Sequence, residues 1–266
     1  MELLVYICPE YRKMIYHYNE TPIFYTISGK GPCLVLLHGF LESSTMWSQL
    51  VPTLSLNRTV LTIDLPGHGK SGCLTSSHSM EMMADALHAL LDYLQIKKLS
   101  IIGHSMGGYV GLAFLEAHGD KVTAFTLLNS TTKEDTREQK HNRDRGVRIV
   151  SENKKAFVST IMNLLFIEHS HRNYASEIAQ LKKEAIGFSN EGIIAAIQGM
   201  RDRTERTKVF QNYKGDKTII CGDKDPVVPL SVSKEIAAAT NSKLKILNGG
   251  HMSWIENLTE LLKLCT

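Results

Sequence analysis

Short apolar runs, separated by amphipathic segments, recur along most of the 266-residue chain. Each run is nearly continuous in hydrophobic residues, which is typical of strands buried on both faces of a parallel sheet. The predicted strands are 15–19, 23–28, 33–37, 58–64, 99–103, 122–129, 218–222 and 244–247. Because they alternate with helical periodicity, the pattern predicts an α/β protein with a doubly wound sheet.

Helical periodicity is clearest between the predicted strands 58–64 and 99–103. Apolar residues from Met80 to Leu94 recur every three or four positions, Ser79 can cap the first turn, and Glu81 lies inside it. A second helix is predicted over residues 109–118, ended by Gly119.

The alternation stops at residue 131 and resumes only after residue 212. The intervening segment is polar, charged and helical in its spacing. Since about 80 residues without a strand are too many for an ordinary connection, they predict an inserted helical subdomain. We therefore divide the chain into a core of residues 1–130 and 213–266 and an insertion of residues 131–212. Residues 1–13, ahead of Met14, are predicted to add little to the fold.

Composition excludes several classes of protein. A net charge of +3 and a pI near 8.5 do not give a surface that follows nucleic-acid phosphates. No apolar run approaches the roughly 20 residues of a membrane span. Five scattered cysteines without C-x-x-C spacing argue against a disulfide framework or a zinc site, so no metal is expected and a cytoplasmic location is favoured.

One short motif predicts a nucleophile. Gly103-His104-Ser105-Met106-Gly107 matches Gly-x-Ser-x-Gly. It follows an apolar strand and opens a helix rich in small residues, which is the context of a nucleophile elbow. The alternative without catalysis is a glycine-rich turn with an incidental serine.

Two further strand ends offer the partners that a serine nucleophile needs, namely a base and a carboxylate that orients it. Asp225 follows one predicted strand and His251 follows the next. Asp223 competes with Asp225, but it can instead cap the turn, while Pro226 holds the loop extended beside Asp225. The predicted triad is therefore Ser105, Asp225 and His251.

Acyl transfer also needs donors for the developing oxyanion. The backbone N–H of Met106, at the start of its helix, is one candidate. The second is the N–H of Phe40, because Gly39 lets the loop after strand 33–37 turn sharply. His38 in this loop is predicted to be structural.

Together these motifs resemble the α/β-hydrolase superfamily from about residue 22 onward. The resemblance is carried by His38-Gly39-Phe40, Asp64-Leu65-Pro66-Gly67-His68-Gly69-Lys70-Ser71, Gly103-His104-Ser105-Met106-Gly107-Gly108, Gly222-x-x-Asp225 and Gly250-His251. It implies an eight-stranded, mostly parallel sheet with a helical cap inserted after the sixth strand. Within the superfamily the chain resembles small serine esterases. Haloalkane dehalogenases and epoxide hydrolases carry Asp at the position of Ser105, which disfavours their chemistry.

The expected function is hydrolysis of a small carboxylic ester, without a cofactor, by a monomer or homodimer. A C–C bond hydrolase or a lyase of the menaquinone-pathway type remains the alternative, acting on an anionic substrate. His104 and Arg201 are the candidate substrate-binding residues, and Arg201 would bind the anionic group of the alternative substrate. A ligand sensor that kept the fold without turnover is a third possibility.

Overall fold

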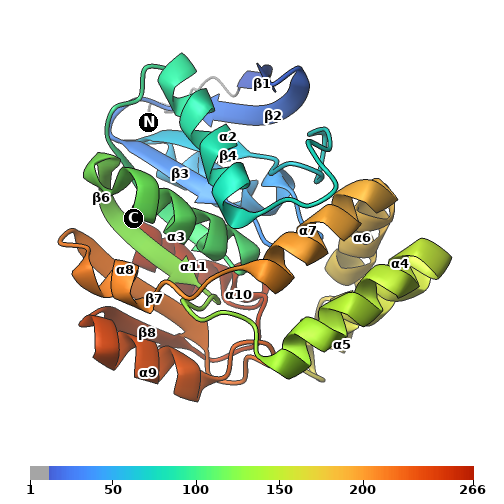
Figure 1. The fold of residues 1–266 in the computed structure, drawn as a ribbon. Helices are drawn as coiled ribbons and strands as arrows, with labels where there is room; N and C mark the ends of the chain where they lie inside the picture. The colour runs from blue at the N-terminus through green and yellow to red at the C-terminus, as the bar shows by residue number, and fades with distance from the viewer. Residues whose placement is uncertain (1–11) are drawn as a thin grey trace, which may run out of the picture.

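Eight strands form one twisted sheet in the computed structural model, which describes residues 12–266 (Figure 1). The sheet order is β1-β2-β4-β3-β5-β6-β7-β8, with β1 and β2 antiparallel and all other neighbours parallel. The strands are β1 (Arg12–Tyr18), β2 (Thr21–Ser28), β3 (Cys33–Leu37), β4 (Thr59–Ile63), β5 (Leu99–His104), β6 (Val122–Leu128), β7 (Asp216–Gly222) and β8 (Lys243–Leu247). Each predicted strand coincides with one of these, so the predicted fold class is confirmed.

The prediction for residues 1–13 lies almost wholly outside the described residues. Its last two positions are described, and for them it is wrong. Arg12 and Lys13 begin β1, where they pair with Ile27 and Thr26 of β2.

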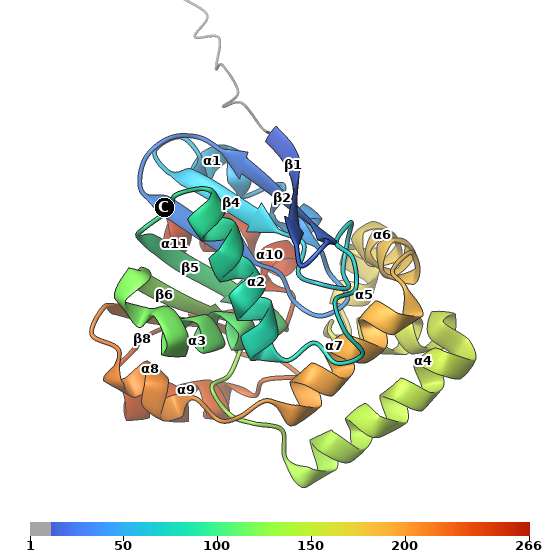
Figure 2. The same ribbon diagram turned by 45° about the horizontal axis from the view of Figure 1, so that its top comes forward.

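Helices cover both faces of the sheet (Figure 2). The helices are α1 (Val51–Leu54), α2 (Met80–Tyr93), α3 (Met106–His118), α4 (Arg137–Leu164), α5 (Ser170–Asn173), α6 (Ala175–Ile186), α7 (Asn190–Asp202), α8 (Thr207–Asn212), α9 (Leu230–Thr240), α10 (Ser253–Glu256) and α11 (Leu258–Cys265), with 3-10 turns η1 (Ser44–Trp47) and η2 (Gly119–Lys121). Apolar side chains of α2, α3, α8 and α9 pack on one face, and those of η1, α1 and α11 on the other. None of the helices within residues 12–266 has the length and apolar character needed to span a membrane.

Local sequence explains the two helices that flank the central strands. The hydroxyl of Ser79 accepts a hydrogen bond from the Met82 amide at 3.1 Å and caps α2, as the sequence predicts. Helix α3 is buried on nearly all sides, and Gly111 lets it approach the sheet, since a Cβ there would lie 2.7 Å from the Phe125 ring.

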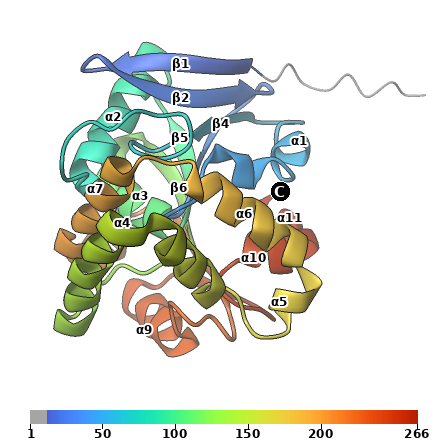
Figure 3. The same ribbon diagram turned by 90° about the vertical axis from the view of Figure 1, so that its right-hand side faces the viewer.

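Helices α4 to α7, the cap helices, lie together beside the carboxyl ends of the central strands (Figure 3). They share an apolar cluster that includes Phe157, Phe188 and Ile197. Helix α4 bends at Asn153, whose side-chain oxygen accepts a hydrogen bond from the Ala156 amide at 3.0 Å and so caps the second half of the helix.

Helix α8 packs with the core and not with the cap helices (Figures 1 and 2). Its Phe210 is fully buried and meets the Phe125 ring of β6 with the ring centres 5.6 Å apart. The boundary placed at residue 212 is therefore too late, because the last cap helix ends at Asp202.

Candidate active site

The Gly-x-Ser-x-Gly motif forms the sharp turn between β5 and α3. Ser105 has φ 47° and ψ −114°, a conformation that side-chain-bearing residues rarely adopt. A Cβ on Gly103 would lie 2.6 Å from the Gly107 carbonyl oxygen, and one on Gly107 would lie 2.4 Å from the Leu37 carbonyl oxygen. Only glycine fits at both positions, so the sequence makes the tight turn that presents the Ser105 hydroxyl.

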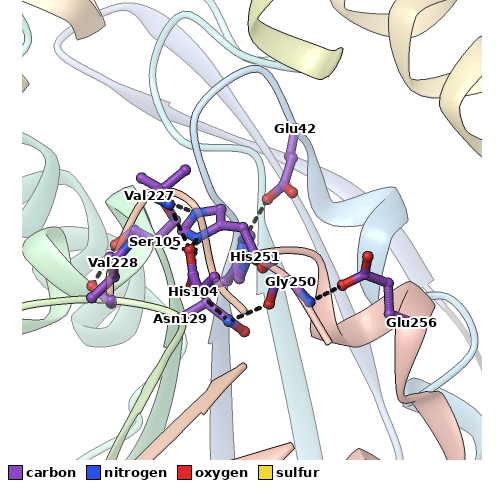
Figure 4. Close-up of polar contacts among 11 residues, drawn as sticks. Glu42, His104, Ser105, Asn129, Val227, Val228, Gly250, His251 and Glu256 are labelled. Carbon is purple, nitrogen blue, oxygen red and sulfur yellow. Dashed lines mark hydrogen bonds and ion pairs between the residues drawn. The ribbon is translucent and has the colours of Figure 1, made fainter. Parts of the chain in front are cut away.

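The three residues of the predicted triad come together in one hydrogen-bonded chain, of which Figure 4 labels Ser105 and His251. The Nε2 atom of His251 lies 2.9 Å from the Ser105 Oγ. On the other side of the ring, Nδ1 lies 2.9 Å and 3.0 Å from the two carboxylate oxygens of Asp225. His251 and Asp225 are both buried. This arrangement allows the imidazole to accept the serine proton while the carboxylate holds its tautomer.

Asp225 rather than Asp223 faces the histidine. The exposed Asp223 accepts a hydrogen bond from the Gly249 amide at 3.0 Å and so joins the loop after β7 to the loop after β8. The Asp225 carboxylate accepts the amides of Val227 and Val228 at 2.8 Å and 2.9 Å. Burial opposes its ionisation, but the His251 ring and these donors together hold the pKa of Asp225 below its usual range.

Asn129 is a supporting residue that the sequence reasoning missed. It ends β6 in a left-handed conformation with φ 45°. Its side-chain amide donates to Asp225 Oδ2 at 3.0 Å and to the Gly250 carbonyl at 3.1 Å. The sequence carried one signal, since asparagine tolerates this conformation better than most residues do.

The two predicted oxyanion donors belong to the start of α3 and to the loop after β3. Met106 is the first residue of α3, so its amide is among those that have no acceptor within the helix. Phe40 follows Gly39, whose own amide is held by Glu42 at 2.6 Å. His38 is fully buried and bonded to the backbone on both sides of its ring, as expected of a structural residue.

His104 is not placed to bind a substrate, contrary to expectation. Its side chain is 1% exposed. Its Nδ1 lies 2.8 Å from Glu42 Oε2, and its Nε2 lies 3.1 Å from the His251 carbonyl oxygen. Both ring nitrogens are therefore engaged within the protein. Glu42 was missed by the sequence reasoning, because its partner lies 62 positions away in the chain.

Arg201 is also committed to protein partners, so the structure does not support its predicted role. It forms ion pairs with Asp144 at 2.7 Å and Asp202 at 2.8 Å on the surface of the cap helices. The next arginine, Arg203, is buried, pairs with Asp135 at 2.6 Å and lies over the Tyr109 ring at 4.1 Å.

Arg206 is a second buried arginine at the end of the cap. It pairs with Glu116 of α3 at 2.9 Å and with Glu81 of α2. The segment that holds both arginines therefore fastens the cap helices to the core.

Two cavities lie near these loops. The larger, about 630 Å³, is lined by residues of β2, η1 and the end of α6 and by none of the three triad residues. The smaller, about 170 Å³, is likewise lined by none of the triad residues, and it has an apolar wall and a polar rim. We call it the Phe40 hollow; it is lined by Phe40, Phe157, Ile161, Ile197, Gly146, Gln139, Asn142 and Arg143. Although it is smaller, its contact with a predicted oxyanion residue makes it the better candidate for holding part of a substrate.

Metal chemistry finds no support in the described part of the chain. Among residues 12–266 no three His, Cys, Asp or Glu side chains are grouped so that they could hold an ion.

Comparison with known proteins identifies the family. The model of the alpha/beta hydrolase fold matches residues 32–258, so the chain belongs to this family. Among solved structures, it is similar to a thermophilic esterase from Thermogutta terrifontis, with 25% sequence identity and a TM-score of 0.88, over 96% of each chain.

Two curated relatives illustrate the range of activities among similar sequences. The chain is 26% identical, over 88% of its length, to the dihydrolipoyllysine-residue acetyltransferase component of the acetoin cleaving system of Pseudomonas putida. It is 28% identical, over 62% of its length, to a putative 2-succinyl-6-hydroxy-2,4-cyclohexadiene-1-carboxylate synthase of Bacillus subtilis. The matches cover 62% and 66% of these relatives, so the chain spans less than two thirds of their length.

Proposed function

We propose that this protein is a serine hydrolase that cleaves small carboxylic esters through an acyl-enzyme. The 2.9 Å contact between Ser105 Oγ and His251 Nε2, with Asp225 behind the ring, carries the proposal. The similarity to the Thermogutta esterase over nearly the whole chain supports the same class of reaction.

In the proposed reaction, His251 Nε2 takes the hydroxyl proton as Ser105 Oγ attacks the ester carbonyl. The amides of Phe40 and Met106 donate to the oxyanion that forms. When the intermediate collapses, the alcohol leaves with the proton from His251 and the acyl group stays on the serine. A water molecule, activated by the same ring, then releases the acid and restores the hydroxyl.

The substrate class follows from the surroundings of Phe40. The Phe40 hollow is walled by Phe157, Ile161 and Ile197 and is small, about 170 Å³. An apolar acyl group of modest length would fill it. Arg201 is paired with Asp144 and Asp202, so its charge is not free to bind an anionic substrate. The proposal includes a cytoplasmic location, which Cys33, Cys73, Cys221 and Cys265 support because they form no disulfide.

The test is a comparison of wild type with Ser105→Ala on p-nitrophenyl esters of graded acyl length. We expect the variant to lose about 10⁶-fold in kcat. A fluorophosphonate probe should label the wild type at Ser105 and leave the variant unlabelled. Equal ester hydrolysis by both proteins would refute the mechanism, and an unlabelled wild type would favour a ligand sensor.

A second candidate is a lyase or C–C hydrolase acting on a carboxylated substrate, supported by the similarity to the Bacillus synthase. The same three residues would then remove a proton from the substrate through His251. Assaying carboxylated cyclohexenes that carry an enolpyruvyl ether for released pyruvate distinguishes the two candidates, because removal of the ring proton then breaks the C–O bond to the enolpyruvyl group. Turnover of these compounds with inert esters would replace the esterase proposal.

A further inference from the structure

His104 differs from His38, another buried histidine near the site, in the atoms that face its ring. In His38, the Leu65 amide donates to Nε2 at 2.8 Å, while Nδ1 faces the Gly39 carbonyl at 2.7 Å. One ring nitrogen must therefore be an acceptor and the other a donor, which is the neutral tautomer. Burial accordingly lowers the pKa of His38.

Only acceptors face the ring of His104. The Glu42 carboxylate lies 2.8 Å from Nδ1, and the His251 carbonyl oxygen lies 3.1 Å from Nε2. A neutral imidazole carries one N–H and would leave a lone pair facing one of these oxygens. With the His104 side chain only 1% exposed, water is not available to relieve that contact. A proton on each nitrogen satisfies both sides.

Glu42 is surrounded by donors that favour its ionised form. The Gly39 amide donates to Oε2 at 2.6 Å, and the indole N–H of Trp254 donates to Oε1 at 3.3 Å. Burial raises the pKa of Glu42, but the His104 ring and the Gly39 amide lower it by more, so that it lies below its usual range. Conversely, burial lowers the pKa of His104, while Glu42 more than offsets this and the net direction is upward.

We propose that His104 and Glu42 form a buried imidazolium–carboxylate pair. This pair positions the loop that contains Gly39 and Phe40, the oxyanion loop, against the catalytic histidine. Glu42 holds the Gly39 amide, next to Phe40, and the His104 ring holds the backbone of His251 (Figure 4). The proposal assigns both residues as positioning residues and rests on the proposed function for its kinetic consequences.

The pair also explains why the oxyanion loop contains a glycine. A Cβ at position 39 would lie 2.6 Å from Glu42 Oε2 and 2.8 Å from His104 Nδ1. The side chains of the pair therefore occupy the space that any other residue at Gly39 would need. The other titratable groups facing the pair are His38, on the side of Glu42, and Asp225 and the His251 ring, on the side of His104.

Nitrogen NMR of the full chain tests the charge directly. We expect both ring nitrogens of His104 to carry protons above about pH 7, where an unperturbed imidazole is mostly neutral. The His104→Asn variant identifies the signals by their loss. Should it fail to fold, Glu42→Gln identifies them by their shift. A single protonated nitrogen on this ring in the wild type would overturn the proposal.

Kinetics test the positioning role. Glu42→Gln should lower kcat on a p-nitrophenyl ester about 100-fold, as expected for a misplaced catalytic group, with KM nearly unchanged. His78→Gln is the matched control, because His78 is buried and neutral, with a pKa lowered to about 4, and lies away from the triad. It should lower the midpoint of thermal unfolding and leave kcat unchanged.

The outcomes separate this inference from the proposed function. If Glu42→Gln behaves like His78→Gln, losing stability but keeping kcat, the pair is only structural and the inference fails. If the fluorophosphonate probe does not label Ser105 of the wild type, the proposed function fails, and the NMR spectrum still decides whether the pair is charged.

Discussion

The loops at the carboxyl ends of the strands and the cap helices hold their side chains by different forces. In the loops, polar groups are buried and bonded to particular partners, as His251 is to Asp225. The backbone is strained there, with positive φ at Leu41, Ser105 and Asn129. In the cap helices the shared interior is an apolar cluster around Phe157 and its neighbours.

This difference indicates that the loops and the cap helices have separate roles. Hydrogen bonds and ion pairs are directional, so they fix the positions of reacting atoms within narrow limits. Apolar packing is not directional and tolerates substitutions that conserve volume. Changes in the loops should therefore alter the rate of the chemical step, while changes in the cap helices should alter which substrates fit.

Among the changes that compare the two regions, the largest loss of kcat is expected from the carboxylate behind the histidine. Asp225→Asn should lower kcat about 10⁴-fold, because the amide no longer holds the productive tautomer of His251. Asp223→Asn is the matched control two residues away, and it should change kcat little. Steady-state kinetics on the best ester measure both. Similar losses in the two variants would show that the acid had been assigned wrongly.

The next largest effect is expected on the free energy of unfolding, from changes to the arginines where the cap helices join the core. Arg203→Leu leaves Asp135, which is 1% exposed, without its closest cation and should lower the free energy of unfolding by about 3 kcal/mol. Arg201→Leu removes partly exposed ion pairs and should cost less than about 1 kcal/mol, with KM unchanged. Urea denaturation compares them, and equal losses would contradict the role given to Arg203.

Within the cap helices, a change at Gly146 tests whether this region determines which substrates fit. Gly146 lines the Phe40 hollow, and a Cβ there would lie 3.1 Å from the Phe157 ring. Gly146→Val should shift the preference toward shorter acyl chains by about 10-fold in kcat/KM. Labelling of Ser105 by a small phosphonate should be unchanged. An unaltered chain-length profile would show that the hollow does not receive the acyl group.

The smallest effect is expected in the dependence of stability on pH. The folded-state pKa values of Asp225 and Glu42 lie below their ordinary values of 3.8 and 4.5. Their contribution is therefore fully present above those ordinary values and is lost as the pH falls through the lower, folded-state values. Urea unfolding between neutral and acidic pH should show this loss, and Asp225→Asn should reduce its slope.

Sequence reasoning succeeded where the signal was local. Gly103 of the elbow, the capping Ser79 and the acid before Pro226 each act on neighbours a few positions away, so their placement could be inferred. It failed for His104 and Arg203, whose partners come from other loops. Arg203 stands in a charged run, a pattern typical of a solvated surface, yet it is buried against Tyr109.

What the sequence alone determined was the order of strands and helices and the three residues that end up at neighbouring strand ends. Apolar runs and tight glycine turns specify those features through short-range sterics and burial. The tertiary structure decided the rest, including the Glu42–His104 pair, the support of Asp225 by Asn129 and the burial of Arg203. Those contacts join segments 60 or more positions apart, and their energies depend on distances and burial that exist only after the loops converge.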